Sequence, residues 1–239
     1  MTVYRLAHWS KKKFECPICG FSGPFADIAP ATGPRRHAQC PDCGALERHR
    51  LQYLVVHSVF AGVDTSMLRV LHVAPEDYFR ILFKKKFKIY ETTDLMMENV
   101  DYRADLTELP FPTASYDVVF ASHVLEHIKD DQQAIAEVRR ILRPGGVAFL
   151  PVPIVAEKTI EYPEPNERES GHVRAPGVDY FLRYTPFFAR VEEYSSFVFA
   201  DKYQLFVYED REGWPPECCP LLLPMKGERH VDIVPACYA

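Results

Sequence analysis

Short apolar runs alternate with amphipathic stretches through the middle of the chain, a pattern typical of an α/β domain. Met67–Val73 and Tyr116–Ala121 are mostly apolar and predict buried strands. A helix of about a dozen residues is predicted after the second strand, followed by the turn Arg143–Gly146 and an apolar strand, Val147–Leu150. Pro144 cannot continue a helix, and the two glycines of the turn permit a sharp reversal. A strand, a crossover helix and a second strand make a βαβ unit, which predicts a parallel sheet.

The remaining pattern extends this sheet in both directions. Lys88–Thr93 predicts a further strand, and a helix is predicted over roughly Asp179–Arg190, interrupted at Pro186. Val191–Ala200 and Lys202–Glu209 read as two strands, which we expect to form an antiparallel hairpin that closes the sheet. The proline-rich end of the chain, which includes Cys218, Cys219 and Cys237, is expected to drape over the body as a tail.

Composition is that of a folded globular protein. The chain has 239 residues, of which 47% are hydrophobic and 26% charged, enough for one α/β domain and a small appendage. No apolar run approaches the ~20 residues that span a bilayer. The N-terminus lacks the apolar core of a signal peptide. We therefore expect a cytoplasmic protein without a membrane segment.

Charge is distributed unevenly along the chain. The net charge is −5, but residues 1–60 carry eight Lys or Arg and four Asp or Glu, so they contribute +4 and the remainder −9. A basic N-terminal module on an acidic body is suited to contact an anionic substrate or nucleic acid. A solvated basic face without a partner is the alternative.

Two cysteine pairs predict a metal site near the N-terminus. Cys16 and Cys19, and then Cys40 and Cys43, form two CxxCG motifs with 20 residues between them. This spacing is typical of a zinc ion bound by four thiolates, which closes the coordination shell and indicates a structural ion. The glycine after each pair permits the backbone to turn. Disulfides are the alternative, and a cytoplasmic location disfavours them.

Three basic residues follow the second motif, at the start of a predicted helix. Arg48, His49 and Arg50 lie in its first turn, where cations oppose the helix dipole. They therefore require an offsetting partner. This is either a structural carboxylate, such as Glu47 or an acidic patch on the body, or an anionic ligand.

The segment YDVVFASHVLEHI, with L–PGG after it, closely resembles the class I S-adenosylmethionine-dependent methyltransferases of the type 11 kind. Together with the CPxCG motifs, it resembles bacterial methyltransferases that carry an N-terminal zinc ribbon. The resemblance implies a doubly wound, seven-stranded, Rossmann-like sheet with a zinc-ribbon module. It implies methyl transfer from S-adenosylmethionine to a small-molecule or sugar acceptor. It divides the chain into a zinc ribbon and linking helix (1–62), a cofactor-binding domain (63–210) with a substrate lid (151–180), and a proline-rich tail (211–239).

The resemblance also implies cofactor residues. Asp94 stands where the family binds the ribose hydroxyls, Asp105 and Leu106 stand at the adenine, and Ser122 follows the strand that faces the methionine. The family's first strand ends in an acidic residue and a glycine-rich turn that closely approaches the cofactor. This chain has His72 in place of the acid and Ala74, Pro75 and Glu76 in place of the turn, so Ala74 and Glu76 are the candidate cofactor residues here. Glu76 is expected either to accept from the cofactor ammonium or to complement the helix that follows.

Catalytic candidates come from two segments. His123 follows the fourth strand, and a neutral histidine there can accept a proton from a hydroxyl or amine. Gly171-His172-Val173-Arg174 resembles an element of the zinc-ribbon group, in which His172 is a candidate base and Arg174 a candidate anion binder. A surface loop held by an arginine–carboxylate pair is the alternative for this element. His127 is expected to pack locally.

Two other functions remain open at this point. The basic ribbon favours RNA methylation, although it lacks the interleaved aromatic residues with which single-strand binders stack bases. The glycine-free turn favours a methyltransferase-like protein that uses its pocket for binding or for other chemistry.

Overall fold

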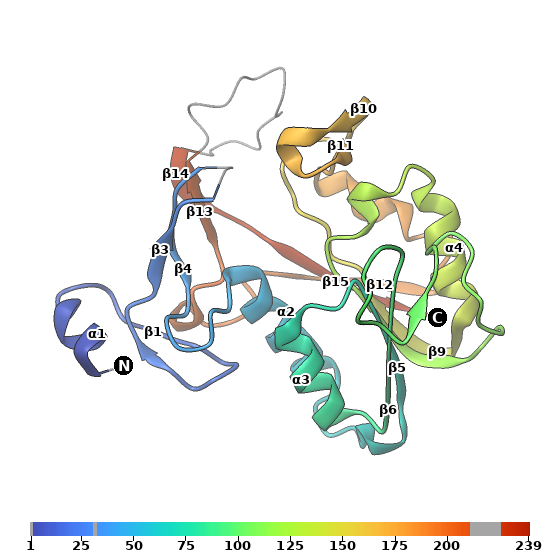
Figure 1. The fold of residues 1–239 in the computed structure, drawn as a ribbon, viewed down its shortest axis with the longest axis horizontal. Helices are drawn as coiled ribbons and strands as arrows, with labels where there is room; N and C mark the ends of the chain where they lie inside the picture. The colour runs from blue at the N-terminus through green and yellow to red at the C-terminus, as the bar shows by residue number, and fades with distance from the viewer. Residues whose placement is uncertain (1, 31–32, 211–225) are drawn as a thin grey trace.

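A computed structural model of the chain describes residues 2–30, 33–210 and 226–239. Its main element is a seven-stranded sheet of order β12-β15-β9-β8-β5-β6-β7 (Figure 1). The strands are β5 (Arg69–Val73), β6 (Ile89–Asp94), β7 (Tyr102–Arg103), β8 (Tyr116–Ala121), β9 (Leu142–Phe149), β12 (Arg190–Ser195) and β15 (Ile233–Tyr238). The strands from β9 to β7 pair in parallel, whereas β15 is antiparallel to both neighbours. The predicted seven-stranded, doubly wound sheet is confirmed.

Helices cover both faces of this sheet because its strands are apolar on both sides. Val70 and Phe120 pack with α2 (Glu47–Val59) and α3 (Asp77–Lys86) in one core. Their chain neighbours Leu71 and Ala121 pack with α4 (Asp131–Ile141) in the other core. Successive strand residues point to opposite faces, so an uninterrupted apolar run supplies both cores. The longest helix among the described residues is far too short and too polar to cross a membrane.

The helix expected over Asp179–Arg190 is wrong. The chain forms a short 3-10 helix, η4 (Val178–Arg183), and then continues in turns. Tyr184 and Thr185 donate their amides to the carbonyls of Phe181 and Leu182, which is the three-residue spacing of a 3-10 turn. Pro186 has no N–H to donate, so an α-helix cannot extend past this point.

The hairpin expected over residues 191–209 is also wrong. β12 pairs with β15 near the end of the chain, from Arg190 opposite Tyr238 to Ser195 opposite Ile233. The expectation of a draped tail therefore fails for residues 226–239. Pro235 obscured this strand in the sequence, but it lies beyond the β15–β9 ladder, which begins at Ala236. The part of the predicted tail at 211–225, with Cys218 and Cys219, lies outside the described residues.

The N-terminal segment and the end of the chain share a second sheet. Its order is β14-β13-β4-β3, and β13 meets β4 through Glu209 opposite Arg35 (Figure 1). The N-terminal elements are α1 (Thr2–Ala7), β1 (Phe14–Glu15), β2 (Ser22–Gly23), β3 (Ala26–Ile28) and β4 (Arg35–Gln39), and the late strands are β13 (Val207–Asp210) and β14 (Lys226–His230). The ribbon is thus joined to the last strands of the chain. The domain limits drawn from the sequence stay a prediction.

The expected lid segment, residues 151–180, contains a separate antiparallel hairpin. It consists of β10 (Ile160–Asn166) and β11 (His172–Ala175), joined by the short 3-10 helix η3 (Glu167–Glu169). Further 3-10 turns are η1 (Thr65–Met67), η2 (Leu125–His127) and η5 (Asp201–Tyr203). Contacts of β11 with η2 bring this hairpin to the carboxyl end of β8.

Candidate functional site

A cavity of about 680 Å³ opens at the carboxyl ends of β5, β6 and β8. Cofactors bind at this edge of parallel sheets, because the loops that leave neighbouring strands meet there. Four of the predicted cofactor residues line the cavity: Ala74, Asp94, Asp105 and Leu106. His123, predicted as a catalytic residue, lines it as well.

The glycine-free turn after β5 adopts a glycine-like backbone. Ala74 has a φ of +47°, in the left-handed region that L-residues rarely adopt. Its amide donates to the carbonyl of Thr93 at 2.9 Å, which ties the turn to the end of β6. The backbone therefore curves at this position as a glycine would, with a methyl group added to the cavity wall.

Replacing Ala74 with glycine is expected to stabilise the protein by about 0.5–1 kcal/mol, because the strain of a positive φ exceeds the extra entropy that glycine loses on folding. Thermal or urea unfolding measures this effect. Ala114, whose φ is +57°, is not among the residues that line the cavity and serves as the matched control. Both variants should gain stability. Destabilisation by Ala74→Gly would mean that the methyl group contributes more than the strain costs.

Asp94 and Asp105 each cap a short turn at the cavity wall. Asp94 Oδ1 accepts from the amides of Met96 and Met97, both at 2.7 Å. Asp105 Oδ1 accepts from the Thr107 amide at 2.8 Å and from its hydroxyl at 2.7 Å. In both residues these contacts use Oδ1 alone. The turns fix the carboxylates in place, and each carboxylate has further lone pairs with which to accept from a ligand.

Glu76 and Ser122 do not line this cavity. His49 Nδ1 accepts from the Leu46 amide, so Nε2 carries the proton and donates to Glu76 Oε1 at 2.9 Å. Arg48 donates to the same oxygen at 3.0 Å. Burial alone raises the pKa of Glu76, but these two donors hold it below its usual value. Glu76 is thus the structural partner of the basic turn, and Ser122 accepts from Gln52 at 2.9 Å.

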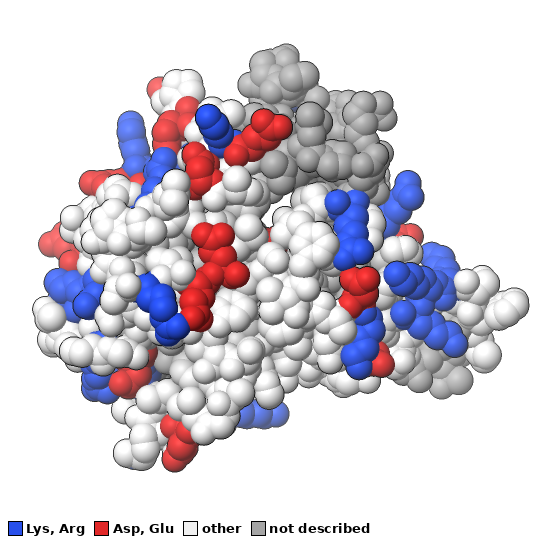
Figure 2. All heavy atoms as spheres, turned by 180° about the vertical axis from the view of Figure 1, so that it is seen from behind, with Lys and Arg blue, Asp and Glu red and all other residues white. Residues whose placement is uncertain are grey.

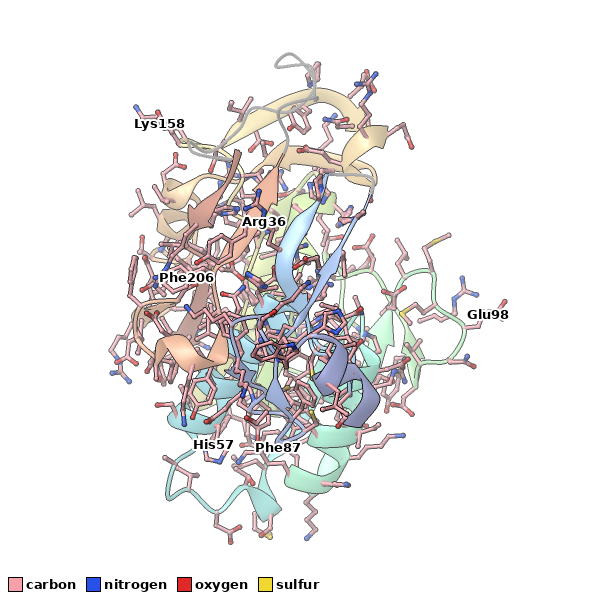
Figure 3. All side chains as sticks on the ribbon, turned by 90° about the vertical axis from the view of Figure 1, so that its left-hand side faces the viewer. Arg36, His57, Phe87, Glu98, Lys158 and Phe206 are labelled. Atoms are coloured by element: carbon pink, nitrogen blue, oxygen red, sulfur yellow. The ribbon has the colours of Figure 1, made fainter. Side chains whose placement is uncertain are left out.

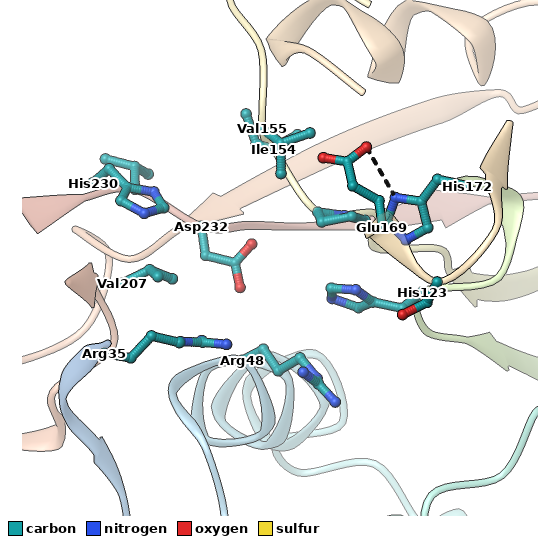
Figure 4. Close-up of a pocket in the computed structure, with 13 residues that line it drawn as sticks. Arg35, Arg48, His123, Ile154, Val155, Glu169, His172, Val207, His230 and Asp232 are labelled. Atoms are coloured by element: carbon teal, nitrogen blue, oxygen red, sulfur yellow. Dashed lines mark ion pairs between the residues drawn. The ribbon is translucent and has the colours of Figure 1, made fainter. Parts of the chain in front are cut away.

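A second pocket, of about 200 Å³, adjoins the first at His123, which lines both. Figure 4 shows His123 and His172 at one end of this pocket and His230 and Asp232 at the other, with Arg35 and Arg48 below. These residues come from the ribbon, α2, the β8–η2 loop, β11, the end of β14 and the β14–β15 connection.

Two arginines line this pocket. Nη2 of Arg35 lies 3.0 Å from a carboxylate oxygen of Glu47, and Nη2 of Arg48 lies 3.0 Å from a carboxylate oxygen of Glu76. The Nε atoms of both are buried and find no hydrogen-bond partner among the described residues. Burial raises the pKa of Asp232 to about 6. The pocket thus combines two cationic side chains with a carboxyl group, that of Asp232, whose pKa burial brings closer to neutral pH.

His123 is held in a strained backbone conformation between the two cavities. Its φ is +55°, and its amide donates to the carbonyl of Pro151 at 2.9 Å. Burial lowers the pKa of His123 well below its usual value, so the imidazole is neutral at neutral pH. Strained residues cluster at functional sites, where the surrounding structure holds them.

Arg174 and His172, adjacent in the sequence motif, are placed differently. His172 lines the second pocket, but Arg174 is buried and does not. Arg174 donates to Glu161 and to the carbonyls of Leu125, Ile128 and Lys129. Its side chain therefore holds the β10–β11 hairpin against η2. This geometry favours the arginine–carboxylate alternative for Arg174.

His230 and Asp232 were missed by the sequence interpretation because they lie in the segment taken as a tail. Arg35 was missed because it is one of several basic residues between the cysteine pairs. The apolar run Ile233–Tyr238, now β15, is the signal from which a strand could have been inferred.

The four cysteines of the CxxCG motifs converge. Their sulfurs lie within 4.8 Å of one another, with Cys16 and Cys43 at 3.7 Å and Cys19 and Cys40 at 3.6 Å. Thiolates bound to one zinc ion at 2.3 Å lie about 3.8 Å apart in a tetrahedron, whereas a disulfide requires about 2.0 Å. Gly20 and Gly44 both have a φ of +77° after their cysteine pairs. The site fits a structural zinc ion.

In a comparison with known proteins, residues 58–150 match the model of a methyltransferase domain family. A probable S-adenosylmethionine-dependent methyltransferase of Mycolicibacterium smegmatis is 49% identical over 55 residues, 23% of this chain and 21% of that protein. The 27-O-demethylrifamycin SV methyltransferase of Amycolatopsis mediterranei is 51% identical over 43 residues, 18% of this chain and 16% of that protein. The chain thus covers about a fifth of the length of these curated relatives.

Solved structures share the fold. Phosphoethanolamine N-methyltransferase 2 of Haemonchus contortus matches 78% of this chain and 52% of its own, with a TM-score of 0.51 and 18% identity. An S-adenosylmethionine-dependent methyltransferase of Mesorhizobium loti matches 78% of this chain and 97% of its own, with a TM-score of 0.50 and 15% identity. At this identity, the likeness extends to the architecture of the sheet and its helices.

Proposed function

We propose that this chain, which carries a methyltransferase domain over residues 58–150, transfers a methyl group from S-adenosylmethionine to a small polar acceptor with an anionic group. The observation that carries the proposal is the meeting of two cavities at His123. The larger cavity has the place and the carboxylates for the cofactor, and the smaller one is lined by two arginines.

The cofactor half is supported by residues that converge from three strand ends. Asp94 is suited to accept from the ribose hydroxyls, Asp105 from the adenine amine, and Leu106 to cover the ring. Ala74 shapes the turn beside them. Bound S-adenosylmethionine supplies an activated methyl group, and these residues would orient it toward the smaller pocket.

The acceptor half is supported by charge and by proton-accepting groups. Arg35 and Arg48, which line the smaller pocket, would hold an anionic group of the acceptor. His123 and His172 are the candidate bases. Asp232 lines the same pocket and is a third candidate. Methyl transfer then rests largely on proximity and in-line orientation, with one of these groups taking the acceptor proton.

Asp94→Ala is expected to weaken the binding of S-adenosylmethionine and S-adenosylhomocysteine by about ten- to a hundredfold, because two charge-assisted hydrogen bonds are lost. Calorimetric titration measures both affinities. Asp64 caps a turn in the same way, through the Ser66 amide at 2.9 Å, so Asp64→Ala is the matched control for losing a cap. Unchanged affinity in Asp94→Ala would remove this residue from the site.

Failure of the wild-type, folded protein to bind either compound would overturn the proposal as a whole. The alternative of a methyltransferase-like protein with another use for its pocket would then lead.

We further infer that the four cysteines hold a structural zinc ion. A cytoplasmic location stays a prediction.

RNA methylation is favoured by one feature, the basic side chains over the N-terminal region, which gather toward the right of Figure 2. At least one of them is neutralised locally, since Lys11 pairs with Asp27 at 3.6 Å. An RNA acceptor predicts binding that weakens steeply as salt rises. Salt-insensitive activity on a small acceptor would exclude it.

A further inference from the structure

A buried carboxylate meets two histidines at the boundary between the two cavities. Glu126 and His127 belong to η2, and His172 begins β11. The contacts of Arg174 bring these elements together, and one ligand atom from each of the three residues lies within 4.8 Å of the others. The proposed methyl transfer assigns no role to Glu126 or His127.

Glu126 is an unusual residue in a protein interior. It is 0% exposed, and neither of its carboxylate oxygens has a hydrogen-bond partner among the described residues. Nδ1 of His123 lies 3.4 Å from Oε1. An unpaired buried carboxylate is costly, so this group needs either a proton or a cation beside it.

The two histidines are accessible, and His172 is supported from behind. His127 is exposed and His172 is half-buried. Nδ1 of His172 faces Glu169 Oε2 at 4.0 Å (Figure 4), and Glu169 is itself held by the Tyr162 hydroxyl at 2.6 Å. Metal-binding histidines commonly have such a carboxylate behind the ligating ring.

We propose that Glu126, His127 and His172 bind a divalent first-row transition metal ion. Two imidazoles and one carboxylate form the protein ligands of known zinc and iron sites that keep open coordination positions. The three ligands leave such positions here too. This differs from the four-cysteine site, in which protein thiolates fill the whole coordination shell.

The open positions face the place where the reaction partners would meet. His172 lines the smaller pocket and His127 lines the cofactor cavity. This part of the inference rests on the proposed function: an acceptor hydroxyl that binds the ion would have a lowered pKa. Its proton would be released to the solvent. The acceptor class is therefore a hydroxyl compound that can bind a metal ion.

Titration of the zinc-loaded, full-length protein with Co²⁺ tests the site, monitored by visible absorption. With the cysteines occupied by zinc, Co²⁺ should bind once per chain and show ligand-field bands without the thiolate charge-transfer bands of a cysteine site. Glu126→Gln and His172→Ala should each weaken Co²⁺ binding at least tenfold. Glutamine has the shape of the protonated carboxyl group, so Glu126→Gln should keep the fold.

His57→Ala is the matched control. His57 lies at the end of the molecule opposite Lys158 and the β10–β11 hairpin (Figure 3), so Co²⁺ binding should be unchanged. The inference is overturned if the wild type binds no Co²⁺ in this way, or if folded Glu126→Gln and His172→Ala proteins bind it as tightly as the wild type. Titration with S-adenosylmethionine separates the two proposals. Cofactor binding without Co²⁺ binding removes only the metal site, and the reverse removes only the proposed methyl transfer.

Discussion

Cys16→Ser is expected to release the zinc ion and to unfold the N-terminal ribbon. Metal binding in such modules contributes about 10–16 kcal/mol of folding free energy, and the loss of one thiolate forfeits a large share of it. The small core around the site holds Phe14, Phe21, Phe25 and two of the cysteines, too little apolar surface to fold alone. Metal content per chain and thermal unfolding, measured together, check this result.

Asp42→Ser provides the control, because it places a serine in the same CxxC loop and leaves all four thiolates in place. Asp42 is exposed, so the metal content and melting temperature of the Asp42→Ser protein should equal those of the wild type. A Cys16→Ser protein that loses no metal and melts at the wild-type temperature would show that the four sulfurs hold no structural ion.

Arg50→Met is expected to destabilise the protein by at least about 3 kcal/mol, since it strips hydrogen-bond donors from buried carbonyl groups. Arg50 is 0% exposed and lies 4.4 Å from the centre of the Phe25 ring. Its guanidinium donates to carbonyls of the ribbon and of the segment after η5: Ala38, Ala45, Tyr203 and Gln204. The variant should therefore loosen the ribbon from the body as well as lower the midpoint of urea unfolding.

Arg36→Met is the matched control for Arg50→Met. Arg36 lies on β4 of the ribbon, is exposed and is labelled in Figure 3. Its loss should change the free energy of unfolding by less than about 0.5 kcal/mol. Equal stability of the two variants would mean that the carbonyls around Arg50 find other donors.

The parallel part of the fold could be predicted because its signals are local. β5 and β8 are short apolar runs, and α4 has an apolar face and a clear end. Parallel order places the loops after these strands at one edge. The resemblance to class I methyltransferases implied that Ala74, Asp94 and Asp105 contact the cofactor there, and all three line one cavity. The four cysteines could be assigned to one site because their spacing alone predicts that they converge.

The antiparallel edge could not be predicted, because its pairing joins distant segments. β12 pairs with β15 across more than thirty intervening residues (196–232), whereas the sequence suggested the nearest run as its partner. Asp232 and His230 were hidden for the same reason. The sequence of the His172–Arg174 motif also does not show that His172 faces a pocket whereas Arg174 is buried against carbonyl groups.

Glu126 shows a further limit of sequence analysis. It reads as an ordinary acid in the first turn after a strand, since acids are favourable there. Its complete burial and its lack of partners among the described residues depend on β11, which arrives from the lid segment. Burial of a polar group by a distant segment leaves no mark on the neighbouring residues.

The place of β15 in the sheet determines when the protein can finish folding during its synthesis. β15 lies between β9 and β12, yet it leaves the ribosome after both. Until then the edge of β9 is open, and β12 lacks the single strand with which it pairs in the described structure. Open strand edges invite pairing with other chains, and long-range pairing is slow. A nascent chain that stops before Ile233 therefore leaves the edges of β9 and β12 unpaired. We expect this intermediate to be the one that most needs protection by chaperones.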